Sequence, residues 1–167
     1  MTYAAQAARE RKMKEVKNAE YYMSIALEEA QKAAAEDEVP VGAVIVKDGD
    51  VIARAHNRKE AASCAVRHAE IEAIELACKA VGNWWLENAE MYVTLEPCAM
   101  CAGALINSRI GKLYYGTEDP KSGCCGSLYN LPADERFNHR FPVVGGIMRM
   151  ECASVLSDYF KGKRQKR

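Results

Sequence analysis

The chain has 167 residues and a formal net charge of zero at pH 7, and this length fits one domain able to bury its own core. Apolar residues make up 49% of it, yet no stretch approaches the ~20 continuous apolar residues of a membrane span. These features argue against an integral membrane protein, and the zero charge gives no global signal for nucleic-acid binding. Residues 1–17 lack the apolar core of a secretory signal, so we expect a cytoplasmic protein.

The chain begins with a charged, alanine-rich segment, residues 1–17, which we expect to be an N-terminal extension that is helical or mobile. Residues 18–167 are expected to form a single domain with a basic C-terminal helix. Apolar side chains recur at helical spacing from Ala19 to Ala33, and this spacing predicts a helix with one buried face. Val39-Pro40 interrupts the pattern.

The rest of the chain alternates between strand-like and helix-like patterns. The pattern predicts strands at 41–47 and 50–57 joined by an Asp48-Gly49 turn, a helix at 68–82, a strand at 91–95, a helix at 98–108, a strand at 110–115, a long loop at 117–140, a short strand at 142–148 and a closing helix at 149–160. Strands that alternate with helices after an initial hairpin predict an α/β fold, with a mixed sheet between helical layers.

Two short motifs carry candidate chemistry, and each lies at the predicted start of a helix. The first is His68-Ala-Glu70, and the second is Pro97-Cys-Ala-Met-Cys101. Both helices are expected to begin at one edge of the sheet, so the motifs can meet there. Two thiolates and one imidazole suit a tetrahedral zinc, and three protein ligands leave the fourth position open, as in catalytic sites.

His68, Cys98 and Cys101 are therefore the predicted ligands of one Zn²⁺ with a bound water or hydroxide. Zinc lowers the pKa of its water from ~15.7 towards ~7. Glu70 lies two residues from a ligand, so we predict that it takes a proton from this water and delivers it to a departing amine. The spacing of the two motifs matches the signature of zinc nucleobase deaminases.

Each motif alone has an ordinary explanation. His-Ala-Glu alone is a helix start with a satisfied histidine, and C-x-x-C alone is a redox pair or half of a zinc ribbon. Their combination favours a catalytic zinc. The odd count of seven cysteines does not indicate a disulfide framework. We expect no second metal site at Cys124 and Cys125, because adjacent cysteines rarely chelate one ion together.

The chain from about 19 to 164 resembles the bacterial tRNA-specific adenosine deaminases of the TadA type, in the cytidine/deoxycytidylate deaminase superfamily. The matching stretches include Glu38-Val-Pro-Val-Gly-Ala43, Tyr92-Val-Thr-Leu-Glu-Pro-Cys98, Ser108-Arg-Ile-Gly111, Asn138-His-Arg140 and Leu156-Ser-Asp-Tyr-Phe160. The resemblance implies a three-layer α/β/α cytidine-deaminase-like fold with a central mixed five-stranded sheet. It also implies a homodimer that converts adenosine to inosine at the wobble position of a tRNA anticodon stem-loop, with an arginine tRNA carrying an ACG anticodon as the suggested substrate.

The resemblance also assigns roles to individual residues. Asn57 would hydrogen-bond the purine, and Val41, Leu95 and the backbone around Glu96 would line the base pocket. RNA contacts are implied for Asp119, Lys121, Ser122, His139, Phe160, Lys163 and Arg164. The last seven residues carry five positive charges; alone they would be a solvated tail, but in this family they would meet phosphates.

Two other functions remain open at this point. The metal motif also fits a deaminase of free guanine, cytidine or deoxycytidylate, although a small-molecule enzyme has no need for a basic C-terminal helix. A zinc module that binds RNA without catalysis would be expected to close its metal site with a fourth ligand. Glu70 argues against that module.

Overall fold

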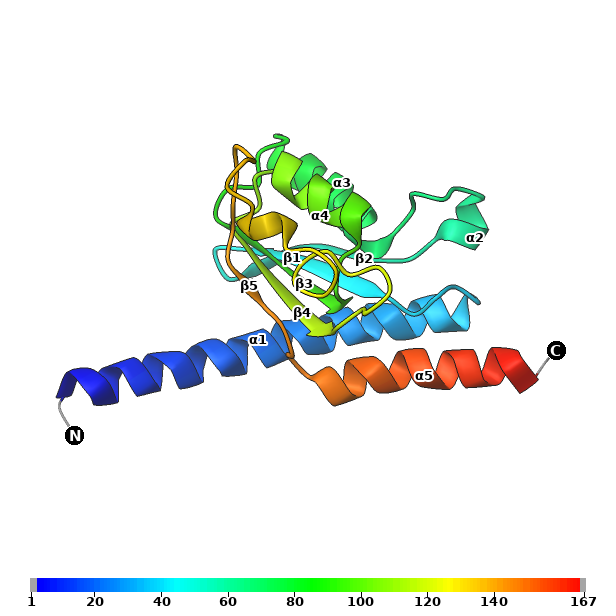
Figure 1. Ribbon diagram of the computed structural model, residues 1–167, viewed down its shortest axis with the longest axis horizontal. Coiled ribbons are helices and arrows are strands. Elements are labelled where there is room, and N and C mark those ends of the chain that lie inside the picture. The colour runs from blue at the N-terminus through cyan, green and yellow to red at the C-terminus, as the bar shows by residue number, and fades with distance from the viewer. Residues whose placement is uncertain (1–2, 166–167) are drawn as a thin grey trace.

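The computed structural model describes residues 3–165, which form a five-stranded mixed sheet between helices (Figure 1). The strand order is β2-β1-β3-β4-β5, and β1 pairs antiparallel with β2 and β3 while β3, β4 and β5 are parallel. The strands are β1 (Gly42–Lys47), β2 (Asp50–His56), β3 (Ala89–Leu95), β4 (Lys112–Thr117) and β5 (Val143–Val144). The predicted mixed five-stranded sheet is confirmed.

Helices cover both faces of this sheet and give the predicted three layers. In Figure 1, α1 (Tyr3–Ala35) and α5 (Arg149–Gln165) lie beneath the sheet, and α3 (Ala69–Val81) and α4 (Ala99–Asn107) lie above it. The two shorter elements are α2 (Lys59–Ala62) and the 3-10 helix η1 (Leu131–Ala133). Each helical layer packs its own buried apolar cluster against the sheet.

The central strands are buried because both faces are covered. All residues of β1 except Lys47 are buried, so this strand is a continuous apolar run. Asp48 and Gly49 have φ of 52° and 87°, as the predicted two-residue hairpin turn requires. Gly42 allows α1 to pack directly on β1, because a Cβ there would lie 2.0 Å from the Ala26 carbonyl oxygen.

The structure differs from the predicted elements mainly at their ends. The extension is helical throughout its described part, since α1 is continuous from Tyr3 and its first turns extend past the sheet (Figure 1). The polar segment after β2 contains α2, which the sequence did not indicate. The predicted strand at 142–148 shrinks to the two residues of β5, and α5 continues to Gln165. The helix predicted at 98–108 is α4, with Cys98 as its N-cap and Pro97 immediately before it.

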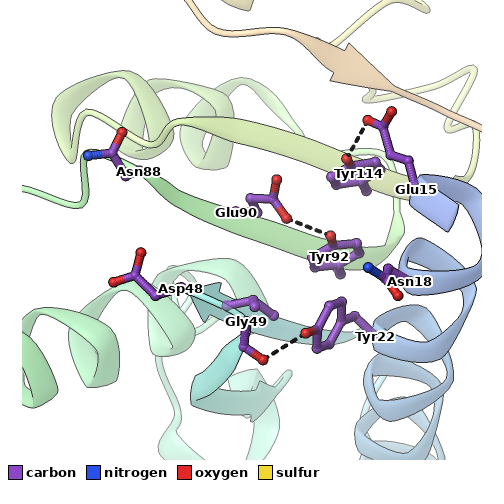
Figure 2. A pocket seen from close by; sticks show the side chains of 10 residues that line it. Glu15, Asn18, Tyr22, Asp48, Gly49, Asn88, Glu90, Tyr92 and Tyr114 are labelled. Atoms are coloured by element: carbon purple, nitrogen blue, oxygen red, sulfur yellow. Dashed lines mark hydrogen bonds between the residues drawn. The ribbon is translucent and has the colours of Figure 1, made fainter. Parts of the chain in front are cut away.

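A column of three tyrosines ties α1 to the sheet at the end that carries the hairpin turn (Figure 2). Tyr92 and Tyr114 stack with ring centroids 4.5 Å apart, and Tyr22 of α1 packs against Tyr92 at 5.1 Å. Tyr22 donates a hydrogen bond to the Gly49 carbonyl, and Tyr114 donates to Glu15 of α1. The extension therefore contacts the sheet through Glu15.

No helix within residues 3–165 is long and apolar enough to cross a membrane.

Candidate active site

The two predicted motifs meet where α3 and α4 begin. His68 is the N-cap of α3 and Cys98 is the N-cap of α4, both with extended backbone. Asn57, which follows β2, fixes the start of α3: its Oδ1 accepts a hydrogen bond from the Ala69 N–H at 2.8 Å. Its Nδ2 donates to the Val39 carbonyl at 3.1 Å, so Asn57 also holds the segment that leads into β1.

The three predicted ligand atoms lie at the spacing of a tetrahedral metal site. Nδ1 of His68 is 3.8 Å from Sγ of Cys98 and 3.6 Å from Sγ of Cys101. With Zn–N of about 2.05 Å and Zn–S of about 2.3 Å, tetrahedral geometry separates nitrogen and sulfur by roughly 3.6 Å. Across residues 3–165 this is the one group of three or more candidate ligands close enough to share an ion, all within 4.8 Å.

The thiols of Cys98 and Cys101 have pKa values that are shifted in opposite directions. The pKa of Cys98 falls to about 4, chiefly because the Cys101 thiol donates a hydrogen bond to its sulfur, with His68 adding a second. The pKa of Cys101 is raised by the same hydrogen bond and by burial. The lowered pKa of Cys98 favours its thiolate form, and the positive end of the α4 dipole favours this form further. Such a donor set fits Zn²⁺.

Glu70 lies in the first turn of α3, and its side chain is buried beside the ligand group. Only 4% of the residue is exposed, and burial raises the pKa of its carboxyl group to about 7, with the negative Cys98 contributing. A carboxyl group with this pKa can both accept and release a proton near neutral pH. This is the property that a proton shuttle needs.

His68, Cys98 and Glu70 line one cavity of about 210 Å³. All four residues predicted for the base pocket line it. The cavity is lined by Val39, Val41, Asn57, Lys59, His68, Glu70, Leu95, Glu96, Cys98, Asp119 and Ser122. The predictions from sequence did not include Val39 and Lys59. Val39 immediately precedes Pro40 in a stretch that carried the family resemblance, whereas Lys59 lies in α2, a helix that no sequence pattern indicated.

The side chain of Glu96 is engaged within the protein. Its two oxygens accept hydrogen bonds from the backbone N–H groups of Asp119 (3.0 Å), Cys125 (3.1 Å) and Ser127 (2.9 Å) and from the Ser127 hydroxyl. Burial alone would raise the pKa of this carboxyl group, but these hydrogen bonds outweigh burial and hold the pKa below its usual value. The group is therefore an anion at neutral pH.

The remaining predicted RNA contacts lie outside this cavity. Lys121 is exposed on the same loop as Asp119. His139 lies near the start of β4, where its Nε2 is 2.7 Å from the Ile110 carbonyl oxygen. Phe160, Lys163 and Arg164 line a neighbouring cavity of about 360 Å³ together with Tyr159 and Val39. Val39 is thus common to both cavities, which places the end of α5 beside the candidate active site.

Cys124 and Cys125 take no part in the ligand group. Both are buried, and burial raises the pKa of each thiol. Trp84 and Trp85 stack on each other and are both exposed, at 59% and 44%.

Comparison with known proteins places this site in a family. The family model of MafB19-like deaminases matches residues 17–164. A tRNA-specific adenosine deaminase of Bacillus subtilis is 51% identical over 89% of this chain and 92% of its own length. The chain is a MafB19-like deaminase of the tRNA-specific adenosine deaminase family. A further member of this family, from Agrobacterium fabrum, is 44% identical over 86% of this chain and 95% of its own length.

Solved structures support the same placement of this tRNA-specific adenosine deaminase family member. A tRNA:A34 deaminase structure, from work on A-to-I editing at the wobble position of transfer RNA, has a TM-score of 0.79 at 45% identity and covers 81% of this chain and 99% of that chain. A guanine deaminase from Nitrosomonas europaea has a TM-score of 0.71 at 26% identity, with 84% and 83% covered. The fold is therefore shared with deaminases of free bases, whereas the higher identity is to the tRNA enzymes.

Proposed function

We propose that this protein hydrolyses the exocyclic amine of adenosine at the wobble position of a tRNA anticodon and so produces inosine. The observation that carries the chemistry is the buried Glu70 carboxyl group beside the ligand group of His68, Cys98 and Cys101, with Glu70, His68 and Cys98 lining one cavity. The relatives named as tRNA-specific adenosine deaminases, at 51% and 44% identity, support the substrate.

The ligand group would hold one Zn²⁺ per subunit. When bound, the ion would supply Lewis-acid activation of a water molecule. Glu70 would accept the proton that the attacking water loses and would then deliver a proton to the amine of adenine, which would leave as ammonia. Because Glu70 is shielded from solvent, the proton stays with the carboxyl group between the two transfers.

The cavity supplies the groups that would orient the base. Val41 and Leu95 offer apolar walls, and Asn57 keeps one N–H of its amide for the purine after donating the other to Val39. A wobble base lies in a single-stranded loop, where it can be unstacked and inserted into a pocket at low cost. Asp119 and Ser122 would meet the flanking nucleotides at the cavity mouth.

The basic end of α5 would extend this contact to the RNA backbone. Phe160, Lys163 and Arg164 line the neighbouring cavity, and Lys163 and Arg164 offer positive charge to phosphates. Lys121 and His139 would add contacts from the loop side. We further propose a homodimer located in the cytoplasm, and an arginine tRNA with an ACG anticodon as the substrate.

The decisive experiment presents the purified, zinc-loaded protein with four classes of substrate: an ACG anticodon stem-loop, free nucleotides, free nucleosides and free bases. We expect inosine to form in the stem-loop and little ammonia to form from free guanine, adenosine, cytidine or deoxycytidylate. Turnover of the free compounds alone would assign the site to a small-molecule deaminase. RNA binding without turnover of any substrate would indicate a non-catalytic module.

A further inference from the structure

The 119–127 loop forms one wall of the candidate active site, and a single buried side chain holds it there. Glu96 is 2% exposed, and the four hydrogen bonds that its oxygens accept come from this loop. One oxygen receives the Asp119 N–H and the Ser127 hydroxyl, and the other receives the Cys125 and Ser127 N–H groups. Hydrogen bonds to a charged acceptor are stronger than neutral ones, so four of them fix the loop firmly.

The backbone next to Glu96 binds the same loop. The Pro97 carbonyl accepts the Cys124 N–H at 2.9 Å, and Cys98 forms an isolated antiparallel bridge with Gly123. The stretch from Glu96 to Cys98 thus carries a metal ligand and also the anchor of the loop. Both are positioned by one short piece of chain at the end of β3.

The packing between loop and anchor leaves no room for adjustment. A Cβ added at Gly123 would lie 2.4 Å from the Glu96 carboxylate and 2.6 Å from the Asp119 carbonyl oxygen. Glycine is therefore required here for close approach. The loop residues Asp119 and Ser122 line the cavity, whereas Lys121 lies exposed between them. A substitution at Glu96 would therefore displace mainly the loop residues that line the cavity, Asp119 and Ser122, and not the metal ligands.

We propose that Glu96 is a positioning residue that holds the 119–127 loop in the form that receives RNA, and so sets substrate affinity rather than the rate of the chemical step. This inference rests on the proposed function. Glu96 itself touches neither the ligand group nor the reacting atoms; it acts through Asp119 and Ser122.

The test compares Glu96→Gln with Glu90→Gln, the same change at the other end of β3, where Glu90 accepts a hydrogen bond from the Tyr92 hydroxyl. In Glu96→Gln an NH₂ group replaces one of the two carboxylate oxygens. This group cannot accept hydrogen bonds from the loop, so the loop would be released. We expect KM for the anticodon stem-loop to rise about tenfold, with kcat within about threefold and zinc content unchanged. Glu90→Gln should match the wild type in all three.

Limited trypsin digestion measures how firmly the 119–127 loop is held, and it does not depend on enzymatic activity. Cleavage after Lys121 should be about tenfold faster in Glu96→Gln than in the wild type or Glu90→Gln. Should the wild type fail to deaminate the stem-loop, the proposed function falls, but this digestion still tests whether Glu96 anchors the loop. Unchanged cleavage at Lys121 would overturn the anchoring.

If Glu96→Gln does not fold, Ser127→Ala provides a milder test. It removes only one of the four hydrogen bonds to Glu96, the one from the Ser127 hydroxyl. It should raise KM about threefold at unchanged kcat and zinc content. Three results would overturn the proposal: an unchanged KM in Ser127→Ala, a loss confined to kcat, or a loss of zinc in either variant that folds.

Discussion

His68 and Cys98 occupy the same position in two different helices, because each is the N-cap residue of a helix on the same face of the sheet. A side chain at an N-cap lies beside the free N–H groups of the first turn. His68 and Cys98 therefore point towards a common region of positive helix-dipole potential, and Cys101 joins them from the first turn of α4. The backbone geometry of the two helix starts thus brings the three candidate ligands together.

Glu70→Gln should remove catalysis without removing the metal. The amide keeps the shape of the side chain but cannot accept and return a proton, so we expect kcat to fall about 10²–10⁴-fold. Single-turnover deamination of the stem-loop measures this fall, and metal analysis should give wild-type zinc. Glu72→Gln, two residues along α3 and paired with Arg67, is the matched control and should keep its activity. Comparable losses in both variants would contradict the role assigned to Glu70.

Removal of a cysteine ligand should affect metal binding as well as activity, unlike Glu70→Gln. In Cys98→Ala and Cys101→Ala we expect zinc binding and turnover to be lost together, because two protein ligands no longer make a stable site. A strong chelator should inactivate the wild type, and added Zn²⁺ should restore it. Cys64→Ala changes a half-buried thiol outside the site and serves as the control. A variant without Cys98 that still retains stoichiometric zinc would show that the assigned donor set is wrong.

Sequence patterns could bring the three candidate ligands together because the determinants of this grouping are local. The helix starts at His68 and Cys98, the turn at Asp48-Gly49 and the C-cap at Gly82 each depend on a few neighbouring residues. The role of Glu96 could not be obtained in this way. Its partners lie 23 to 31 residues further along the chain, and no periodic pattern records such contacts. The same limit explains why α2 and Lys59 were missed.

The charge on Glu70 should destabilise the metal-free protein above neutral pH. Its carboxyl pKa is about 7 in the folded chain and 4.5 as the ordinary value. The folded state therefore binds more protons between these values, and stability is lost as pH rises from 4.5 to 7, by roughly 3 kcal/mol at most. Urea denaturation of chelated protein should show Glu70→Gln more stable than wild type at about pH 8, with the difference vanishing near pH 4.5. An equal difference at both pH values would contradict this.

Asn57→Ala should weaken the connection between the start of α3 and the segment that leads into β1. It leaves the Ala69 N–H without its acceptor and removes one of the two hydrogen bonds that the Val39 carbonyl accepts, the other coming from the Val41 N–H, so we expect a loss of roughly 2–3 kcal/mol in the free energy of unfolding. The start of α3 would loosen with it, and kcat should fall as Glu70 shifts. Asn83→Ala removes an exposed acceptor for Trp85 and should cost less than about 1 kcal/mol. Similar losses in both variants would argue against a special role of Asn57.

Neutralising the end of α5 should change how RNA binding depends on salt. If Lys163 and Arg164 contact phosphates, their joint replacement by alanine removes two charge contacts with the RNA. The slope of log K against log salt concentration should then become shallower by about 1.4–1.8. Titration of the anticodon stem-loop over a series of KCl concentrations measures this slope, and Lys79→Ala on α3 provides the control. Lys163 also pairs with Asp37 at 2.6 Å, so Arg164→Ala alone should account for at least half of the change. A slope that stays at its wild-type value in the double variant would place the RNA backbone elsewhere on the protein.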